Sequence, residues 1–255
     1  MGAATADFNV HTEALSGLLP VPAFRAVPFG IETLPLAGAV RPRHRHGAGY
    51  ATVVLAGSFL ETGFAGRLAV GPGDVLLHGT LDCHADRPLT RQRIEILRLP
   101  WHDDTLEGRF QVRDPDCLVR LAEHDPAAAA LALGATLSAC AQREVEWTHA
   151  LARLLVGGSA LPLARMAATW GLCPAELSRG FRCTFGVSPK RFRLEARARC
   201  AWRSVIGSPR SLTRIAQDHG FADLAHMSRS VREFTGIAPN RWRQAQRRGQ
   251  QVRSS

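Results

Sequence analysis

Two hydrophobic patterns divide this chain. Between about residues 43 and 99, short apolar runs such as Tyr50–Ala56, 67–70 and 75–78 are separated by turns rich in Gly and Pro. Closely spaced runs of this kind predict the strands of an all-β sandwich or barrel. From residue 114 onward, apolar residues instead recur at helical spacing, and 114–156 predicts two or three helices.

The helical pattern is sharpest after residue 160. Residues 163–170 place apolar side chains at i, i+3, i+4 and i+7, which predicts one amphipathic helix. Pro174 is suited to open the next helix, on which Leu177, Phe181 and Phe185 form a buried stripe. Two short helices joined by a turn that contains glycine are typical of a helix-turn-helix unit.

The same helix-turn-helix pattern occurs twice in the sequence. A second support helix is expected at 212–219 and a second following helix at 223–234, with Asp223 as its N-cap. Between the copies, a longer helix at 189–206 would fix their separation. A repeat of this size indicates one duplicated supersecondary unit. The pairs at an offset of fifty residues are Ser178/Ser228, Arg179/Arg229, Arg182/Arg232, Gly186/Gly236, Pro189/Pro239, Phe192/Trp242 and Arg193/Arg243.

Charge separates the chain in the same way. Residues 1–150 carry 13 Arg against 17 Asp and Glu, a net charge of −4, whereas 151–255 carry 19 Lys and Arg against 5 Asp and Glu, a net charge of +14. A basic module behind an acidic one predicts binding to a polyanion. A solvated basic face, or attraction to a membrane surface, would give the same charge, so the charge alone does not decide.

Cysteine usage and hydropathy indicate the cellular compartment of the protein. The six cysteines form no CxxC pair, and no charged-then-apolar signal segment opens the sequence. No apolar run approaches the roughly 20 residues that span a bilayer. A cytoplasmic chain with reduced thiols and no membrane partner is expected.

Three histidines stand out in the β-rich part. His44 and His46 precede the run at 50–56, and His84 follows a Pro-Gly-Asp turn. This arrangement over residues 40–100 resembles a cupin barrel, although residues 48–51 lack the Glu that completes the ligand set of metal-binding cupins. The resemblance implies a metal ion such as zinc or a small-molecule effector at these histidines. Polar residues that merely line the barrel mouth remain the alternative.

The repeated helices resemble the DNA-binding domain of the AraC/XylS family of bacterial transcription regulators. The motifs that carry the resemblance are 177–179 with Phe181 and 186–189 in the first copy, and Gly220-Phe221, Ser228-Arg229, Gly236 and Pro239 in the second. The expected fold is therefore α+β with two domains. It comprises a cupin-like sensor and dimerisation barrel at 1–110, a helical connector at 111–143 and an AraC-type DNA-binding domain at 144–250.

The resemblance implies a sequence-specific regulator of transcription that responds to a ligand and is not an enzyme. Its partners would be double-stranded DNA, a small-molecule effector, a second copy of the chain and RNA polymerase. Each recognition helix would present its outward face to the major groove. The residues on these two faces are Ala175, Glu176, Ser178, Arg179, Arg182, Leu224, Ala225, Ser228, Arg229 and Arg232.

The resemblance implies that Arg179 and Arg229 reach bases, where they can fork onto guanine, with a phosphate contact as the alternative. Glu176 could accept from cytosine N4, and phosphate contacts are favoured for Arg182 and Arg232. Because the second copy offers few polar groups to bases, the first is expected to supply more of the specificity. The C-terminal arginines add charge for phosphates or form a solvated end; they are Arg241, Arg243, Arg247, Arg248 and Arg253.

Two other classes of protein remain open. One is a metal-dependent cupin enzyme, or a metal or redox sensor at Cys83 beside His84, tethered to DNA by the basic domain. The other is a DNA-repair protein with an alkyl-accepting cysteine, against which the scattered cysteines weigh. Metal content and the effect of chelation would separate the first class from a regulator.

Overall fold

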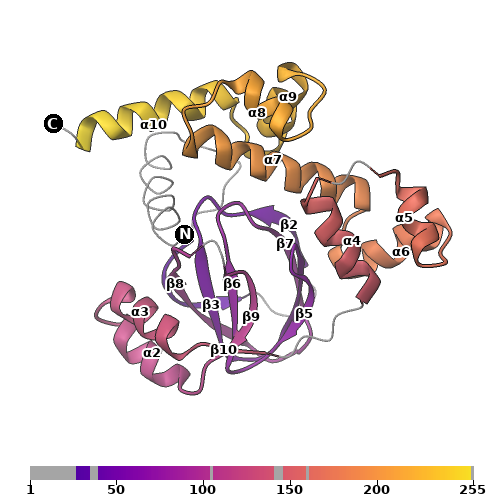
Figure 1. Ribbon diagram of the computed structural model, residues 1–255. Helices are drawn as coiled ribbons and strands as arrows, with labels where there is room; N and C mark the ends of the chain where they lie inside the picture. The colour runs from indigo at the N-terminus through magenta and orange to yellow at the C-terminus, as the bar shows by residue number, and fades with distance from the viewer. Residues whose placement is uncertain (1–26, 35–39, 104–105, 141–145, 159–160, 254–255) are drawn as a thin grey trace. The chain divides into compact units, whose positions relative to one another are not determined.

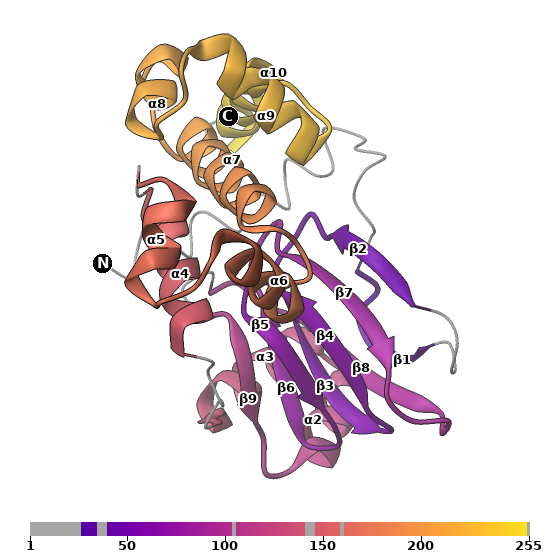
Figure 2. The same ribbon diagram turned by 90° about the vertical axis from the view of Figure 1, so that its right-hand side faces the viewer.

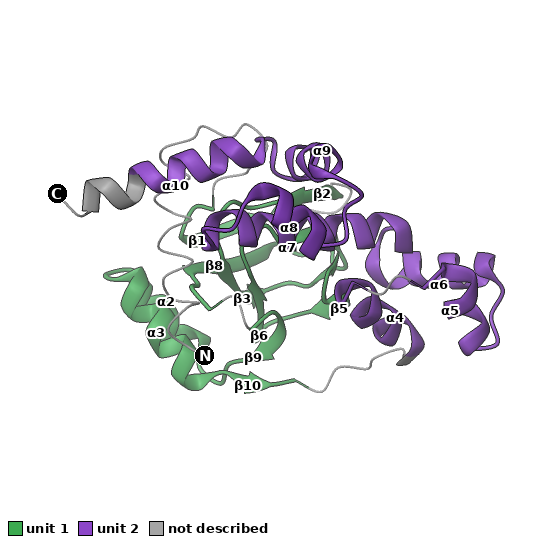
Figure 3. Cartoon of the chain, turned by 45° about the horizontal axis from the view of Figure 1, so that its top comes forward, with its two compact units in different colours: residues 1–12, 24–143 green, residues 13–23, 144–255 purple. Residues whose placement is uncertain are grey.

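A computed structural model describes residues 27–34, 40–103, 106–140, 146–158 and 161–253 (Figure 1). The chain forms two compact units that part between residues 143 and 144 (Figure 3). Among the described residues, none of the helices combines the length and apolarity needed to cross a membrane.

The N-terminal unit contains two antiparallel sheets, whose strands can be followed in Figure 2. One sheet has the order β1 (Gly30–Leu34), β8 (Ile94–Pro100), β3 (Tyr50–Ala56), β6 (Asp74–His78), β9 (Gly108–Gln111) and β10 (Ser138–Ala139). The other has the order β2 (Arg41–Arg45), β7 (Cys83–Pro88), β4 (Phe59–Gly63) and β5 (Gly66–Val70).

The strand-rich fold confirms the expected class, but the barrel is not closed. In the described part of the chain, β2 pairs only with β7, and β5 pairs only with β4. Closure of a barrel requires the outer strands to pair with each other, and these strands do not. The N-terminal fold is therefore a cupin-like pair of sheets rather than a continuous barrel.

Side-chain alternation along the strands produces two hydrophobic layers. Val54, Leu76 and Ile96 of the larger sheet pack with Phe59 and Val70 of the smaller one to form the interior of the sandwich. The opposite face of the larger sheet also carries apolar residues, and helices cover it.

Those helices are α2 (Pro115–Ala122) and α3 (Pro126–Thr136), in the segment expected to be a connector. Each begins at an aspartate N-cap followed by proline. Leu118 of α2 and Leu133 of α3 join the core on the outer face of the sheet. The two helices are therefore a structural layer of the N-terminal unit.

The C-terminal unit is helical and follows the predicted order. Figure 1 shows α7 running from the group α4–α6 to the group α8–α9. The helices are α4 (Glu146–Val156), α5 (Leu163–Thr169), α6 (Pro174–Phe185), α7 (Pro189–Gly207), α8 (Leu212–Asp218), α9 (Leu224–Thr235) and α10 (Pro239–Arg253).

The sequence repeat is also a conformational repeat. Helices α6 and α9 both end at a left-handed glycine, Gly186 with φ 74° and Gly236 with φ 78°. The glycine amides donate to the carbonyl oxygens of Arg182 and Arg232 at 2.9 and 2.7 Å. Left-handed backbone favours glycine because any Cβ is strained there, so both helices end in the same way.

The cores of the two copies differ. In the first, Phe181, Phe185 and Phe192 lie with ring centroids 4.4–5.2 Å apart. In the second, the position equivalent to Phe185 is Thr235, and Trp242 occupies the position of Phe192. The Trp242 indole lies 5.6 Å from that of Trp202 and donates to the buried Thr235 hydroxyl at 2.9 Å. The core of the second copy thus contains a tryptophan pair, one member of which is hydrogen-bonded to Thr235.

Replacing Thr235 by Val should destabilise the C-terminal unit by about 1–3 kcal/mol. The indole N–H of Trp242 would lose its buried acceptor, and burying an unsatisfied donor carries a cost of this size. Thr235→Ser keeps the hydroxyl and is the matched control, expected to lose less. Urea unfolding followed by tryptophan fluorescence measures both, because Trp147, Trp170, Trp202 and Trp242 lie in this unit. Equal losses in the two variants would contradict this role for the hydroxyl.

Candidate DNA-binding surface and buried histidine cluster

Helices α6 and α9 bury one stripe and expose the face expected to meet DNA. Leu177 and Phe181 on α6, like Met227 and Val231 on α9, are fully buried. On the opposite sides, Ser178, Leu224 and Ser228 are half-buried, and the other seven residues are exposed, namely Ala175, Glu176, Arg179, Arg182, Ala225, Arg229 and Arg232. Each helix therefore presents two exposed arginines one turn apart on its outer side.

Glu176 is engaged within its own helix. Its carboxylate accepts the backbone N–H of Cys173 at 2.9 Å, at the start of α6. This hydrogen bond is the main cause of a lowered pKa for Glu176. A carboxylate bound to a free helix-start N–H stabilises that helix end. Glu176 thus supports the start of α6, where Cys173 is the N-cap.

The start of α9 is capped differently. Asp223, the predicted N-cap, accepts the backbone N–H of His226 at 2.6 Å. His226 stands fifty residues after Glu176, and its ring lies edge-on to Phe221 with centroids 5.3 Å apart. The corresponding third residues of the two recognition helices are thus a capping carboxylate and a histidine that packs on an aromatic ring.

Two arginines of the repeat hold the chain just ahead of the support helices. Arg193 donates to the Leu161 carbonyl at 3.3 Å, before α5. Arg243 donates to the carbonyls of Val205, Ser208 and Arg210, before α8. Burial lowers the pKa of both guanidinium groups. Arg243 is therefore a buried structural residue and not part of a phosphate-binding tail.

Two further arginines connect α7 to the second helix-turn-helix copy. Arg191 pairs with Glu195 on α7 at 2.7 Å and with Glu233 on α9. Arg197 donates to the Gly220 carbonyl at 3.0 Å, and its guanidinium lies 5.7 Å from the centre of the Phe221 ring. Part of the basic charge of this unit therefore fixes helices in place.

The C-terminal segment that was expected to be a charged tail continues the sequence repeat. Pro239 opens α10 as Pro189 opens α7, and Trp242 and Arg243 repeat Phe192 and Arg193. On α10, Arg241, Arg247 and Arg248 are exposed. The side chain of Arg253 lies outside the described residues.

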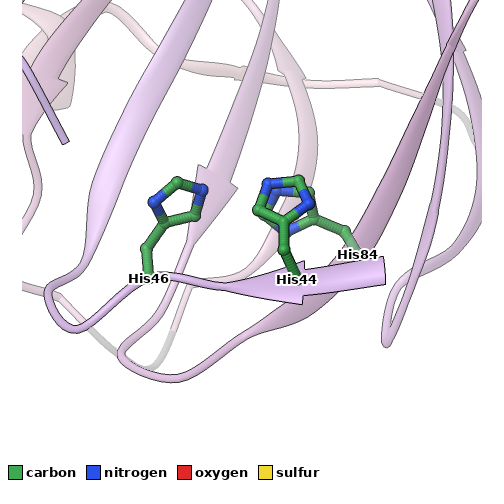
Figure 4. Close-up of side chains that lie close together, drawn as sticks. All are labelled: His44, His46 and His84. Carbon is green, nitrogen blue, oxygen red and sulfur yellow. The ribbon is translucent and has the colours of Figure 1, made fainter. Parts of the chain in front are cut away.

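The N-terminal unit brings the three predicted histidines together. His44 pairs with His84 across β2 and β7, and their ring centroids are 4.4 Å apart. His46 lies 4.9 Å from His44 and 5.5 Å from His84. Figure 4 shows the three rings projecting from the same side of these neighbouring strands. One nitrogen from each lies within 4.8 Å of the others, a spacing that suits a metal ion or a polar ligand.

The sequence did not identify the polar residues that extend this cluster. His78 ends β6, and its two ring nitrogens face Asp82 at 3.0 Å and Glu61 at 3.4 Å. The Tyr50 hydroxyl is 3.2 Å from Nε2 of His84. Tyr50, Glu61 and His78 are each at most 5% exposed. The available signal was a charged or polar residue inside an otherwise apolar run, as at Glu61 in β4.

Burial and close contact shift the protonation of the cluster. Burial, followed by the neighbouring histidines, lowers the pKa of His46 to about 2. Burial also raises the pKa of Glu61 to about 6 and raises that of Tyr50 well above its usual value. For His84 burial acts downward, but the carboxylates of Glu61 and Asp82 outweigh it and raise the pKa to about 9. The site thus combines a neutral imidazole with a charged one beside carboxylates.

Comparisons with known proteins agree with the C-terminal geometry. Residues 166–245 match a family model described as a helix-turn-helix domain. No curated protein matches the chain.

Three solved structures are similar at low identity. A transcriptional regulator with an AraC-type DNA-binding domain from Chromobacterium violaceum is 22% identical, covering 40% of this chain and 92% of its own, with a TM-score of 0.37. A probable AraC family transcriptional regulator from Rhodopseudomonas palustris is 20% identical, covering 39% and 95%, with a TM-score of 0.36. ToxT from Vibrio cholerae, with bound unsaturated fatty acid, is 10% identical, covering 84% and 91%, with a TM-score of 0.37.

The family match and the duplicated helices define the class of the C-terminal domain. Residues 166–245 form a helix-turn-helix domain. The motifs of both copies that resemble the AraC type lie within this domain.

Replacing Arg243 by Ala should destabilise the C-terminal unit by about 2–3 kcal/mol, because buried carbonyls would lose charged donors. Arg248→Ala, on the exposed side of the same helix, is the matched control and should stay within about 0.5 kcal/mol of the unchanged chain. Urea unfolding measures both. If Arg243→Ala unfolded like the control and only weakened DNA binding, Arg243 would be a phosphate contact after all.

Proposed function

We propose that this regulator reads two successive major-groove segments with α6 and α9 and responds to a ligand held in its N-terminal unit. The observation that most directly supports this proposal is a repeated pair of exposed arginines. The pairs are Arg179 and Arg182 on α6 and Arg229 and Arg232 on α9. Two recognition helices on one connector suit groove segments about 34 Å apart on one face of the DNA. A single copy of the chain would then recognise an asymmetric site.

The residues of each face have different roles in this proposal. Arg179 and Arg229 fork onto guanine O6 and N7, a contact worth about 1–3 kcal/mol of discrimination each. Arg182 and Arg232, one turn further along, contact phosphates and set the register. Ser178 and Ser228 lie beside the base-reading arginines, and the apolar positions contact thymine methyl groups; these are Ala175, Leu224 and Ala225.

The hydrogen bond of Glu176 alters the expected balance between the copies. A carboxylate that caps α6 is less available to accept from cytosine N4. We therefore assign Glu176 to the support of the recognition helix rather than to base readout. This removes the main reason to expect the first copy to provide more specificity than the second.

The N-terminal unit is the proposed sensor. His44, His46 and His84 supply its ligand contacts, since one nitrogen from each lies within 4.8 Å of the others. We propose that the sensor includes 1–110, that the helices of 111–143 cover its sheet, and that 144–250 binds DNA. Helices α2 and α3 support this arrangement, because they complete a hydrophobic core with the sheet.

A homodimer is also proposed. Leu131 is 78% exposed on α3, and Ala127 and Ala135 on the same side of that helix are exposed as well. An exposed apolar helix face suits contact with a second copy. RNA polymerase and a cytoplasmic location follow from the proposed role in transcription. Enzyme activity is not part of the proposal.

Arg179→Ala and Arg229→Ala should relax sequence preference by about 1–3 kcal/mol each, because each removes a base contact. The double change of Arg247 and Arg248 to Ala is the control for charge. It should weaken binding to all sequences alike and flatten the dependence of affinity on salt. Gel-shift titrations on selected and scrambled DNA at several salt concentrations measure both effects. Full selectivity in Arg229→Ala would refute the role of α9.

A further inference from the structure

A second group of potential metal ligands shares His84 with the three histidines. It consists of Glu61 on β4, His78 on β6 and His84 on β7, and one ligand atom from each lies within 4.8 Å of the others. All three residues are at most 5% exposed. The carboxylate missing beside the histidine pair in sequence is thus present in space, from another strand.

We propose that the N-terminal unit binds one divalent transition-metal ion through Glu61, His78 and His84. Imidazole and carboxylate ligands together suit zinc, cobalt or nickel better than calcium or magnesium, which prefer all-oxygen sites. Three protein ligands also leave a fourth position open for water or an effector. The ion would be the signal of the proposed sensor, and in that respect alone the inference rests on the proposed function.

The distance between His78 and Glu61 supports shared coordination. Nδ1 of His78 lies 3.0 Å from Asp82, so an N–H there donates to that carboxylate. The lone pair of the neutral ring is then on Nε2, which faces Glu61 Oε2 at 3.4 Å. Metal bonds of about 2.0–2.1 Å in a tetrahedron place neighbouring ligand atoms about 3.4 Å apart. Two acceptors at this distance are the pair that an ion would bridge.

Asp82 completes the arrangement as an outer residue. It hydrogen-bonds His78 and lies 3.8 Å from Nδ1 of His84. A carboxylate behind a histidine ligand fixes the ring and its tautomer, and such partners recur around metal ions. Asp82 therefore orients His78 through a hydrogen bond and lies near His84, without contacting the ion.

Buried charge also favours a cation here. Glu61, Asp82 and Asp86 are each at least nine-tenths buried. Within the described residues, Oδ1 of Asp82, Oδ1 of Asp86 and Nδ1 of His84 make no hydrogen bond. Buried carboxylates are costly unless they are paired, hydrogen-bonded or close to a metal ion. A divalent ion would offset part of that cost.

The backbone holds these residues in a demanding conformation. Leu81, next to Asp82, has φ 60°, which is unfavourable for a side chain of its kind. Gly63 allows close approach to β7, because a Cβ there would lie 2.9 Å from the Cys83 carbonyl oxygen and 3.0 Å from Cβ of His84. Such features gather at functional sites because the surrounding fold maintains them. Leu81 precedes Asp82, and Gly63 lies against the proposed ligand His84.

The first test uses the full chain without DNA. Chelator-treated protein is titrated with Co²⁺, with visible absorption and calorimetry recording binding. We expect one ion per chain, a tetrahedral d–d spectrum and a higher melting temperature. X-ray absorption should find two imidazoles and one carboxylate. The absence of a saturable site would overturn the proposal and leave His78 as a structural residue between two carboxylates.

Variants then locate the ion. Glu61→Gln should weaken Co²⁺ binding at least about 100-fold, and Asp82→Asn about 10–100-fold as an outer residue. His124→Gln, an exposed histidine of the same unit, is the matched control and should bind Co²⁺ unchanged. His44→Gln decides between sites. If it weakens binding more than Glu61→Gln does, the ion belongs to the histidine triad and the proposal fails.

Folding and function are checked separately. Far-UV circular dichroism shows whether each variant folds, and the absorption experiment on the unchanged chain stands even if one does not. Because metal binding is measured without DNA, it can fail while the arginine variants still relax DNA selectivity. Unchanged DNA selectivity in Arg179→Ala and Arg229→Ala, together with intact Co²⁺ binding, would instead refute the proposed function alone.

Discussion

The spacing of the two recognition helices depends on α7 and on the arginines that anchor it. Ala198, Trp202 and Val205 bury one side of α7 completely. Arg193 and Arg243, fifty residues apart, each donate to carbonyls just ahead of a support helix. The same contact thus closes each copy of the unit. Because the connector is packed along its length and fastened at both ends, α6 and α9 are presented at a fixed separation. The proposed reading of two groove segments requires a fixed separation of this kind.

The N-terminal sheets meet a different constraint, because their interior contains charge. Apolar residues such as Val54 and Leu76 fill one part of the sandwich, whereas Glu61, His78 and His84 occupy another. Buried polar groups of this density are stable only when they are paired with one another or with a ligand. A site whose groups are completed by a ligand couples ligand binding to the stability of its unit. This coupling is the property that a sensor needs.

Local signals in the sequence predicted most of the C-terminal unit. Proline at the helix starts, glycine at the ends and apolar spacing between them indicated α5 to α9 correctly, because these signals act within one or two turns. The sequence placed Arg243 in a charged C-terminal tail because no local signal shows its contacts. Only the fold brings Arg243 to the end of α7. Likewise, Glu61 and His78 lie on strands whose pairing with distant segments is not encoded in their spacing. The histidines at 44, 46 and 84 were identifiable, but Glu61, His78 and the open form of the sheets were not.

The central claim is that one chain reads two groove segments with two separate helices. Methylation interference on DNA selected from a random pool by the full chain tests it most directly, since it maps the guanine N7 atoms that binding requires. We predict paired clusters about one helical turn, near 34 Å, apart on one face. One cluster of each pair should be lost in Arg179→Ala and the other in Arg229→Ala. A single cluster, or the same cluster lost in both variants, would contradict the account.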